Sequence, residues 1–242
     1  MARAVRPQKL KDQVETYMRD AINSGEWSAG ELHSVGEVAD EFGVSRTPVR
    51  EAVLQLADAG LVAFERNVGF RILRSTPSQI VEIFHLRLLL EVPATRLTAR
   101  DAGEETLATM RAELAEMSAA AKKGDESLFM QHDRYFHDAA ISGAGNDRLI
   151  TTVDRLRDAT RLIGASTVER RRSLFDIADE HRPILDAFER RDAAAAAAAM
   201  RDHVVHTGSL LLSISLGDQD GPESDSTAAL KQRWSELSEP DH

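Results

Sequence analysis

Four side chains in the second half of the sequence have the types and spacing of metal ligands. Asp133 and His137 lie four residues apart, so both project from one face of a predicted helix. His181 follows in a later predicted helix, and His203 lies in the last one. One carboxylate and three imidazoles from three helices suit zinc, manganese, nickel or a related divalent ion, and helical bundles commonly hold metals this way.

Each histidine taken alone has a more ordinary interpretation, as a hydrogen-bonded core residue or a surface residue. His132 points about 100° away from Asp133 on a helix, so the two are not expected to share a site. The histidines for which the ordinary interpretation is favoured are His33, His85, His132, His206 and His242.

A second set of residues has the chemistry for reading DNA. In a predicted helix from Arg46 to Ala59, the side chains of Arg46, Thr47 and Arg50 fall within one arc of roughly 100°, and apolar residues cluster on another. Arginines at the start of such a helix can reach guanine O6 and N7 in the major groove, while Ser45 and Thr47 suit phosphate contacts. Solvated surface charge is the commoner role of an isolated arginine pair. The helix, turn, helix and hairpin around this pair favour DNA reading instead.

The hairpin that follows this helix is the second part of the predicted DNA-binding surface. Two short strands, Val62–Arg66 and Phe70–Arg74, are predicted on either side of Asn67-Val68-Gly69, a loop containing the glycine that tight hairpins favour. The hairpin residues assigned to contacts with the DNA backbone or the minor groove are Arg66, Asn67, Gly69 and Arg71.

Residues 1–75 supply the elements that would position this surface. Apolar residues at helical spacing from Leu10 to Ile22 predict a first helix. Ser34 is placed to cap a short second helix, and Gly43 ends that helix in a tight turn before the third. Helix, helix, turn, helix and hairpin together predict a winged helix-turn-helix domain.

A second, all-helical domain is predicted over residues 78–216, after a break at Ser75-Thr76-Pro77-Ser78. Its amphipathic segments predict an antiparallel helical bundle, so the fold class is mainly α. The predicted helices cover residues 78–100, 104–123, 125–142, 147–165, 169–190 and 192–216. Residues 217–242 are acidic and rich in Asp, Ser, Gly and Pro, and we predict a largely disordered tail with a transient helix at Leu230–Leu237.

Composition narrows the class of protein. Of 242 residues, 42% are hydrophobic and 29% charged, and no apolar run approaches bilayer length, which excludes a membrane protein. The absence of cysteine and of a secretory signal predicts a cytoplasmic location without disulfides or thiolate metal sites. A net charge of −10 argues against nucleic acid as a partner. Residues 1–75, however, contain 10 Lys and Arg against 11 Asp and Glu, so DNA binding needs only a local basic face.

The first 75 residues resemble the GntR superfamily of bacterial regulators. The segments that carry the resemblance, in order, are Ser24-Gly25-Glu26, Gly43–Ala52, Asp58-Ala59-Gly60-Leu61-Val62 and the hairpin Gly69. The sequence departs from the family pattern at Gly36, where the family often has an arginine that assists DNA contact. More of the base reading is then left to Arg46, Arg50 and the hairpin.

Residues 80–215 resemble the FadR C-terminal-domain, or FCD, branch of that superfamily. The segments that carry this resemblance are Arg87–Glu91, Asp133–His137, Asn146–Leu149, Glu180–Ala187 and Asp192 leading to His203. In metal-binding members of the branch, the positions that match Asp133, His137, His181 and His203 coordinate a divalent ion beside an effector cavity. Members that bind acyl-CoA lack this set, so the resemblance implies a small polar effector, often a carboxylate.

The resulting hypothesis is a homodimeric regulator, usually a repressor in this family, that binds a short palindromic operator in double-stranded DNA and responds to the effector. Arg87 is a candidate anchor for an effector carboxylate, and a structural pair with Glu91 is the alternative. Two rival functions are a metal-dependent hydrolase, motivated by the His132-Asp133 dyad, and a regulator that senses the metal alone. The hydrolase leaves the N-terminal domain unexplained and offers no general base or nucleophile.

Overall fold

The chain folds as two units in the computed structural model, which describes residues 7–23, 26–58, 60–66, 68–73, 76–168, 172–217 and 225–239. The first unit comprises the chain up to Ser75 together with residues 161–165, and the second comprises the remainder. No helix within the described ranges is long and apolar enough to cross a bilayer.

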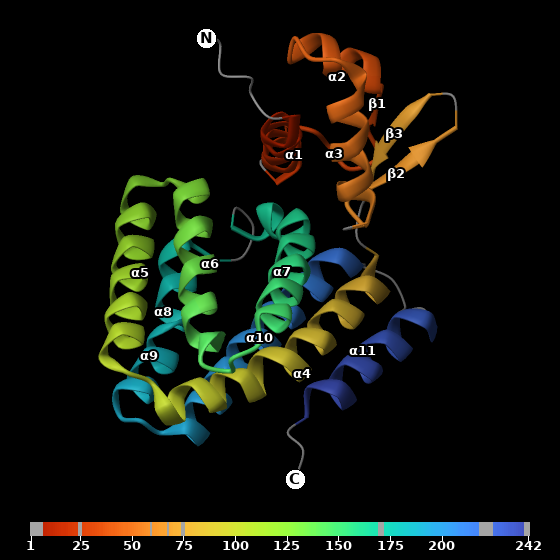
Figure 1. Ribbon diagram of the computed structural model, residues 1–242. Helices are drawn as coiled ribbons and strands as arrows, with labels where there is room; N and C mark the ends of the chain where they lie inside the picture. The colour runs from red at the N-terminus through yellow and green to blue at the C-terminus, as the bar shows by residue number, and fades with distance from the viewer. Residues whose placement is uncertain are drawn as a thin grey trace, which may run out of the picture. The chain divides into compact units, whose positions relative to one another are not determined.

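The first unit contains the predicted helix-turn-helix (Figure 1): α1 (Pro7–Asn23), α2 (Val35–Glu41) and α3 (Arg46–Asp58). Ser34 begins α2 with a capping box, since its hydroxyl accepts from the Glu37 backbone and the Glu37 carboxylate accepts from the Ser34 backbone. Gly43, at φ +61°, makes the left-handed turn between α2 and α3. The apolar faces of α1 and α3 pack together, which leaves the opposite face of α3 exposed.

A three-stranded antiparallel sheet completes this unit, with the strand order β1 (Leu32–His33), β3 (Gly69–Ile72), β2 (Val62–Glu65). The β2–β3 hairpin confirms the predicted wing, although both strands end earlier than predicted. The sequence analysis missed β1, because two residues are too few to show strand alternation. Asn67 lies outside the described residues.

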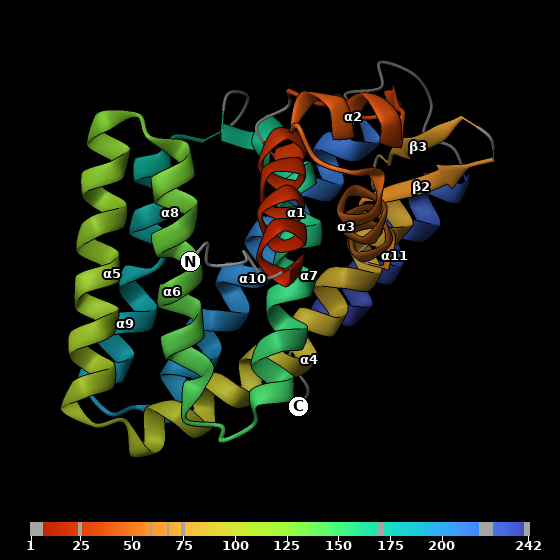
Figure 2. The ribbon, with the colours of Figure 1, turned by 45° about the horizontal axis from the view of Figure 1, so that its top comes forward.

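The second unit is helical throughout its described residues (Figures 1 and 2). Its helices are α4 (Pro77–Asp101), α5 (Glu104–Lys123), α6 (Glu126–Ser142), α7 (Asp147–Val168), α8 (Leu174–Glu180), α9 (Arg182–Glu189), α10 (Ala193–Leu216) and α11 (Asp225–Ser238). α10 packs along α4, and α5 packs beside α6. Helices α8 and α9 pack against α5. Side-chain caps begin several of these helices: Thr76, Asp125 and Asp192 each accept a hydrogen bond from a backbone N–H of the first turn.

The prediction of one continuous helix over residues 169–190 is wrong. It is two helices, α8 and α9, that meet at His181, which ends the first and begins the second. Pro183 lies in the first turn of α9, where its missing N–H needs no partner, and it cannot donate in a continuous helix.

The prediction of a disordered tail is wrong for residues 225–238, which form α11. Trp234 is 6% exposed and packs edge-on against Phe84 of α4, and its Nε1 donates to Ser209 Oγ at 2.9 Å. Gly208 of α10 makes room for this ring, because a Cβ there would lie 2.8 Å from Trp234. The polar average composition of this segment does not reveal the helix, because the burial of a single tryptophan is enough to attach it to the unit.

We predict that Gly69→Ala destabilises the first unit by about 1–3 kcal/mol. A Cβ at this position would lie 1.9 Å from the His33 carbonyl oxygen, and Gly69 has φ +154°, so β1 and β3 cannot keep their pairing. Chemical unfolding measures the effect. Val68→Ala, a change at a half-exposed side chain of the same hairpin, is the control, and equal stability of the two variants would contradict the prediction.

Candidate metal centre and DNA-reading surface

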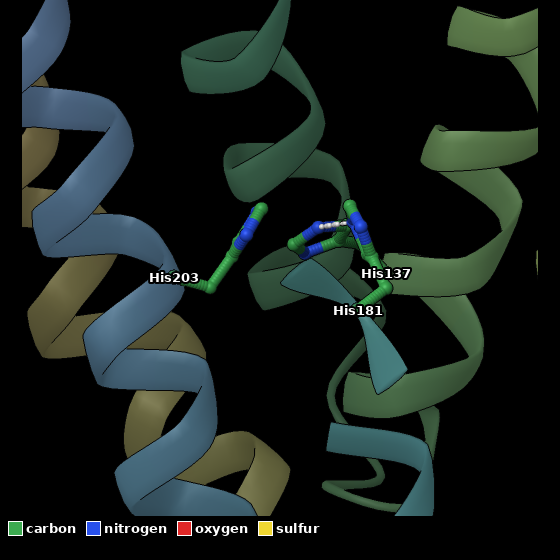
Figure 3. A group of neighbouring side chains, drawn as sticks. All are labelled: His137, His181 and His203. Carbon is green, nitrogen blue, oxygen red and sulfur yellow. Dashed lines mark hydrogen bonds between the residues drawn. The ribbon is translucent and has the colours of Figure 1, made fainter. Parts of the chain in front are cut away.

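Three of the predicted metal ligands meet inside the second unit. His137 comes from α6, His181 from the junction of α8 and α9, and His203 from α10, and their rings turn toward one another (Figure 3). The ligand nitrogens all lie within 4.8 Å of one another, and all three residues are buried. Residues far apart in the sequence therefore form one imidazole cluster.

Hydrogen bonds on the outer side of two rings fix where their protons lie. The Nδ1 of His181 lies 2.8 Å from the Ile177 carbonyl oxygen, and the Nδ1 of His137 lies 3.0 Å from Glu91 Oε2. Both partners accept, so each Nδ1 carries the proton and donates. A neutral ring with its proton on Nδ1 has a lone pair on Nε2, and the two Nε2 atoms lie 3.1 Å apart, at hydrogen-bond distance. Two facing lone pairs repel unless a cation lies between them.

Asp133, the fourth predicted ligand, adjoins this cluster. Its Oδ1 lies 3.2 Å from His181 Nε2, and its Oδ2 accepts from Arg157 Nη2 of α7. Only the ligand nitrogens of the three histidines all lie within 4.8 Å of one another, so among the described residues Asp133 lies at the edge of the cluster. Oδ1 of Asp133 therefore faces the imidazole of His181, and Oδ2 is fixed by the Arg157 guanidinium.

His203 is oriented by a residue that the sequence analysis missed. Its Nδ1 lies 3.4 Å from Glu180 Oε2, at ion-pair distance, but without the alignment of a hydrogen bond. Glu180 is itself fixed by Arg172 Nη1, which lies 2.9 Å from each carboxylate oxygen. With Nδ1 turned toward Glu180, His203 has its Nε2 available for the cluster. Outer carboxylates and carbonyls of this kind typically hold metal-binding histidines in place.

The charges around the cluster favour the protonation states that metal binding needs. Burial raises the pKa of Glu91 and of Asp133, but Arg87 and His137 beside the first, and Arg157 and His181 beside the second, outweigh it and hold both values well below the usual range. Burial lowers the pKa of His137 well below its usual value, and Arg157 adds to the effect. Burial and His181 lower the pKa of His203 to about 4. Ionised carboxylates at Glu91 and Asp133 and neutral rings at His137 and His203 result.

Arg87 takes the position that its structural alternative predicts. Its Nε donates to Glu91 Oε1 at 2.6 Å, and its guanidinium lies 4.9 Å from the centre of the Phe84 ring. The side chain is 4% exposed. One of its donors is therefore already used within α4.

His132 takes no part in the cluster, as its direction on the helix predicts. Its Nδ1 lies 2.7 Å from Glu113 Oε2 on α5, whereas Asp133 faces His181 and Arg157. The two adjacent residues have different neighbours, so they form no catalytic dyad.

The helix predicted to read DNA, α3, has one buried face and one exposed face, as expected. Val49, Ala52, Val53 and Leu56 are fully buried, whereas Ser45, Arg46, Thr47 and Arg50 are exposed. Absence of a side chain at Gly36 leaves room for the Arg46 guanidinium, since a Cβ there would lie 3.3 Å from Arg46 Nη2.

The wing presents a less uniform surface. Arg66 is exposed, but Arg71 is engaged within the unit, where Nε donates to Glu65 Oε1 at 2.8 Å and Nη1 donates to the Gly30 carbonyl at 2.7 Å. Arg66 is thus the freer of the two predicted wing arginines.

Comparison with protein families matches both units. Residues 10–72 match the family described as bacterial regulatory proteins, gntR family, and residues 82–206 match the FCD domain. A protein of Paenarthrobacter nicotinovorans named "Probable D-xylose utilization operon transcriptional repressor" is 31% identical over 198 residues, which cover 81% of this chain and 85% of that protein. The chain belongs to the gntR family of bacterial regulators and carries its FCD domain. It is a DNA-binding transcriptional regulator, and the resemblance found in the sequence is confirmed.

Other relatives and solved structures agree. The gluconate operon transcriptional repressor of Bacillus subtilis is 33% identical over 129 residues, covering 53% of each chain. The structure of Escherichia coli McbR/YncC superposes with a TM-score of 0.73 at 22% identity, covering 84% of this chain and 96% of that one. A Rhodococcus sp. RHA1 structure described as a putative transcriptional regulator GntR gives 0.73 at 23% identity, with 84% and 97% covered. These two structural likenesses establish the fold.

We predict that acid destabilises the metal-free protein through its buried histidines. The unfolded chain takes up a proton on His203 near pH 6.5, whereas the folded protein does so only at about pH 4. This contribution to stability is complete above pH 6.5 and is lost as the pH falls toward 4, a shift worth roughly 3 kcal/mol. Urea unfolding between pH 7.5 and 4.5, with chelator present, measures it.

His203→Gln should flatten this pH dependence by about one proton, whereas His206→Gln, a change at an exposed neighbour on the same helix, should leave it unchanged. The same slope in both variants would show that the His203 ring is not held neutral by the fold.

Proposed function

We propose that this regulator is a repressor whose operator affinity is set by a small carboxylate effector bound at a divalent-metal site in the second unit. The observation that carries the metal site is the pair of Nε2 atoms of His137 and His181, 3.1 Å apart while each Nδ1 donates elsewhere. The names of the relatives support repression, since several are repressors.

The ligands that we assign to the ion are His137, His181, His203 and Asp133. Three neutral imidazoles and one ionised carboxylate fit zinc, manganese or nickel by donor type. A divalent ion with four protein ligands would supply open coordination positions that a carboxylate can fill. The Ile177 carbonyl, Glu91 and Glu180 keep the rings in the orientation that such binding requires.

The charge balance of this site supports an anionic effector. Arg87 and Arg157 are balanced by Glu91 and Asp133, all of them buried, and burial favours the neutral forms of His137 and His203. A divalent cation would leave a surplus of positive charge inside the unit, which an anion compensates. The surplus of positive charge favours a carboxylate effector over regulation by the metal alone, and nothing in this charge balance supports hydrolysis.

We also propose a homodimer, since paired half-sites in a palindrome need a protein with two-fold symmetry. Leu86, Leu89 and Leu97 are about half exposed and lie along one side of α4, an apolar face that a second copy of this chain would cover. Sedimentation of the wild type and of Leu89→Glu checks this: we expect a dimer that the charge weakens, and a monomeric wild type would contradict it.

For DNA, we predict that Arg46→Ala and Arg50→Ala each reduce discrimination for the operator by about 1–3 kcal/mol, because a bidentate arginine contact to guanine is lost. Binding is measured at fixed salt on a site selected from random DNA. Arg19→Ala, which removes an α1 arginine paired with Glu15, is the control. Unchanged affinity in both α3 variants would remove these residues from the reading surface.

For the metal, we predict that His181→Ala and His203→Ala each lower the bound ion well below one per chain and blunt the effector response, while DNA binding by the metal-free protein persists. Elemental analysis of untagged protein purified without chelator measures this. His132→Ala, on the same helix as His137 but bonded to Glu113, should keep the ion. A wild-type protein that holds no ion and acquires none from zinc, manganese or nickel would refute the site.

A further inference from the structure

Arg157 of α7 has a buried guanidinium, and two of its nitrogen donors have no hydrogen-bond partner in the part of the chain that the structure describes. The residue is 5% exposed, and its Nη2 donates to Asp133. Its Nε and Nη1 are buried and have no hydrogen-bond partner among the described residues. Nη1 lies 3.6 Å from Glu91 Oε2, beyond hydrogen-bond distance.

Unused N–H groups on a buried charge are rare, because water that would otherwise bind them has been removed. A ligand, an ion or a buried water normally accounts for such groups. The missing partner here must be an acceptor, since a guanidinium only donates. The charge of the group further favours an anion over a neutral acceptor.

The position of Arg157 connects it to the proposed metal site through one side chain. Asp133 accepts from Arg157 with Oδ2, and its Oδ1 lies 3.2 Å from His181 Nε2. The unused donors and the facing imidazole nitrogens therefore flank the same carboxylate. An anion held by the metal would lie near a guanidinium already fixed in place.

We propose that Arg157 donates to a carboxylate oxygen of the effector through Nη1 or Nε, an inference that rests on the proposed effector site. Carboxylate is the class of group that fits, because an anionic oxygen makes a charge-assisted hydrogen bond to a buried guanidinium donor. This assignment replaces Arg87 as the principal anchor, since Arg87 donates through Nε to Glu91 and lies over Phe84. Arg172 also has an unpartnered Nε, but its Nη1 is committed to both oxygens of Glu180.

The test uses acetate as the probe and the full-length protein loaded with Co²⁺, whose visible absorption reports changes at the metal. Arg157→Gln should take up cobalt as the wild type does and bind acetate about tenfold more weakly or worse. Arg134→Gln is the matched control, because it removes a neighbouring arginine that is paired with Asp154 at 2.7 Å. Its acetate affinity should stay near that of the wild type.

Three results would count against the proposal in different ways. Cobalt uptake with unchanged acetate affinity in Arg157→Gln overturns the role of Arg157 alone, and a buried water then accounts for the donors. An equal loss in both variants overturns it in favour of general electrostatic attraction. A wild-type protein that takes up no metal overturns the metal site and this inference together.

If the Arg157→Gln variant fails to fold or to load metal, the wild-type protein provides the test. In a crystal structure of the wild-type protein with Zn²⁺ and acetate, a carboxylate oxygen within hydrogen-bond distance of Arg157 Nε or Nη1 supports the proposal. An acetate bound at the metal without that contact overturns it.

Discussion

The second unit depends on the interactions of one buried carboxylate, that of Glu91. It is fully buried in the middle of α4, and it accepts from Arg87 on its own helix and from His137 on α6, while Arg157 of α7 lies within ion-pair distance. Removing one partner from a buried ion pair typically costs about 3–5 kcal/mol, because the other charge is left uncompensated. Three helices are thus held in one arrangement by a single charge. The contact with Glu91 also keeps the proton of His137 on Nδ1. The carboxylate that joins the helices therefore also orients this ring for metal binding.

The local sequence brings the remaining groups to this point. His181 stands at the junction of α8 and α9, and its Nδ1 donates to the Ile177 carbonyl in the preceding turn. Glu180, one residue earlier, lies at ion-pair distance from His203. A single short segment therefore supplies one imidazole and positions another.

Patterns that operate within one helix were predictable, and contacts between distant residues were not. Asp133 and His137 share a face by helical geometry alone, and the two faces of α3 follow from the same rule. The pairing of His137 with Glu91 joins residues 46 apart, so no local spacing reveals it. Arg157 looks like a surface arginine on an amphipathic helix, and only the packing of α7 shows that it is buried. The anchoring of α11 by Trp234 was missed for the same reason, since Gly208 and Phe84 come from two other helices.

The two tryptophans of this chain give each unit its own optical label. Trp27 is buried in the first unit, stacked on His33 with ring centres 4.1 Å apart. Trp234 lies against Phe84, whose ring contacts Arg87, the partner of Glu91. Its indole is therefore three side-chain contacts away from the carboxylate that fixes His137. In a Trp27→Phe background, tryptophan fluorescence comes from the second unit alone, and in a Trp234→Phe background from the first. The order in which the two units respond to ligand and to DNA can then be followed in solution without attaching a dye.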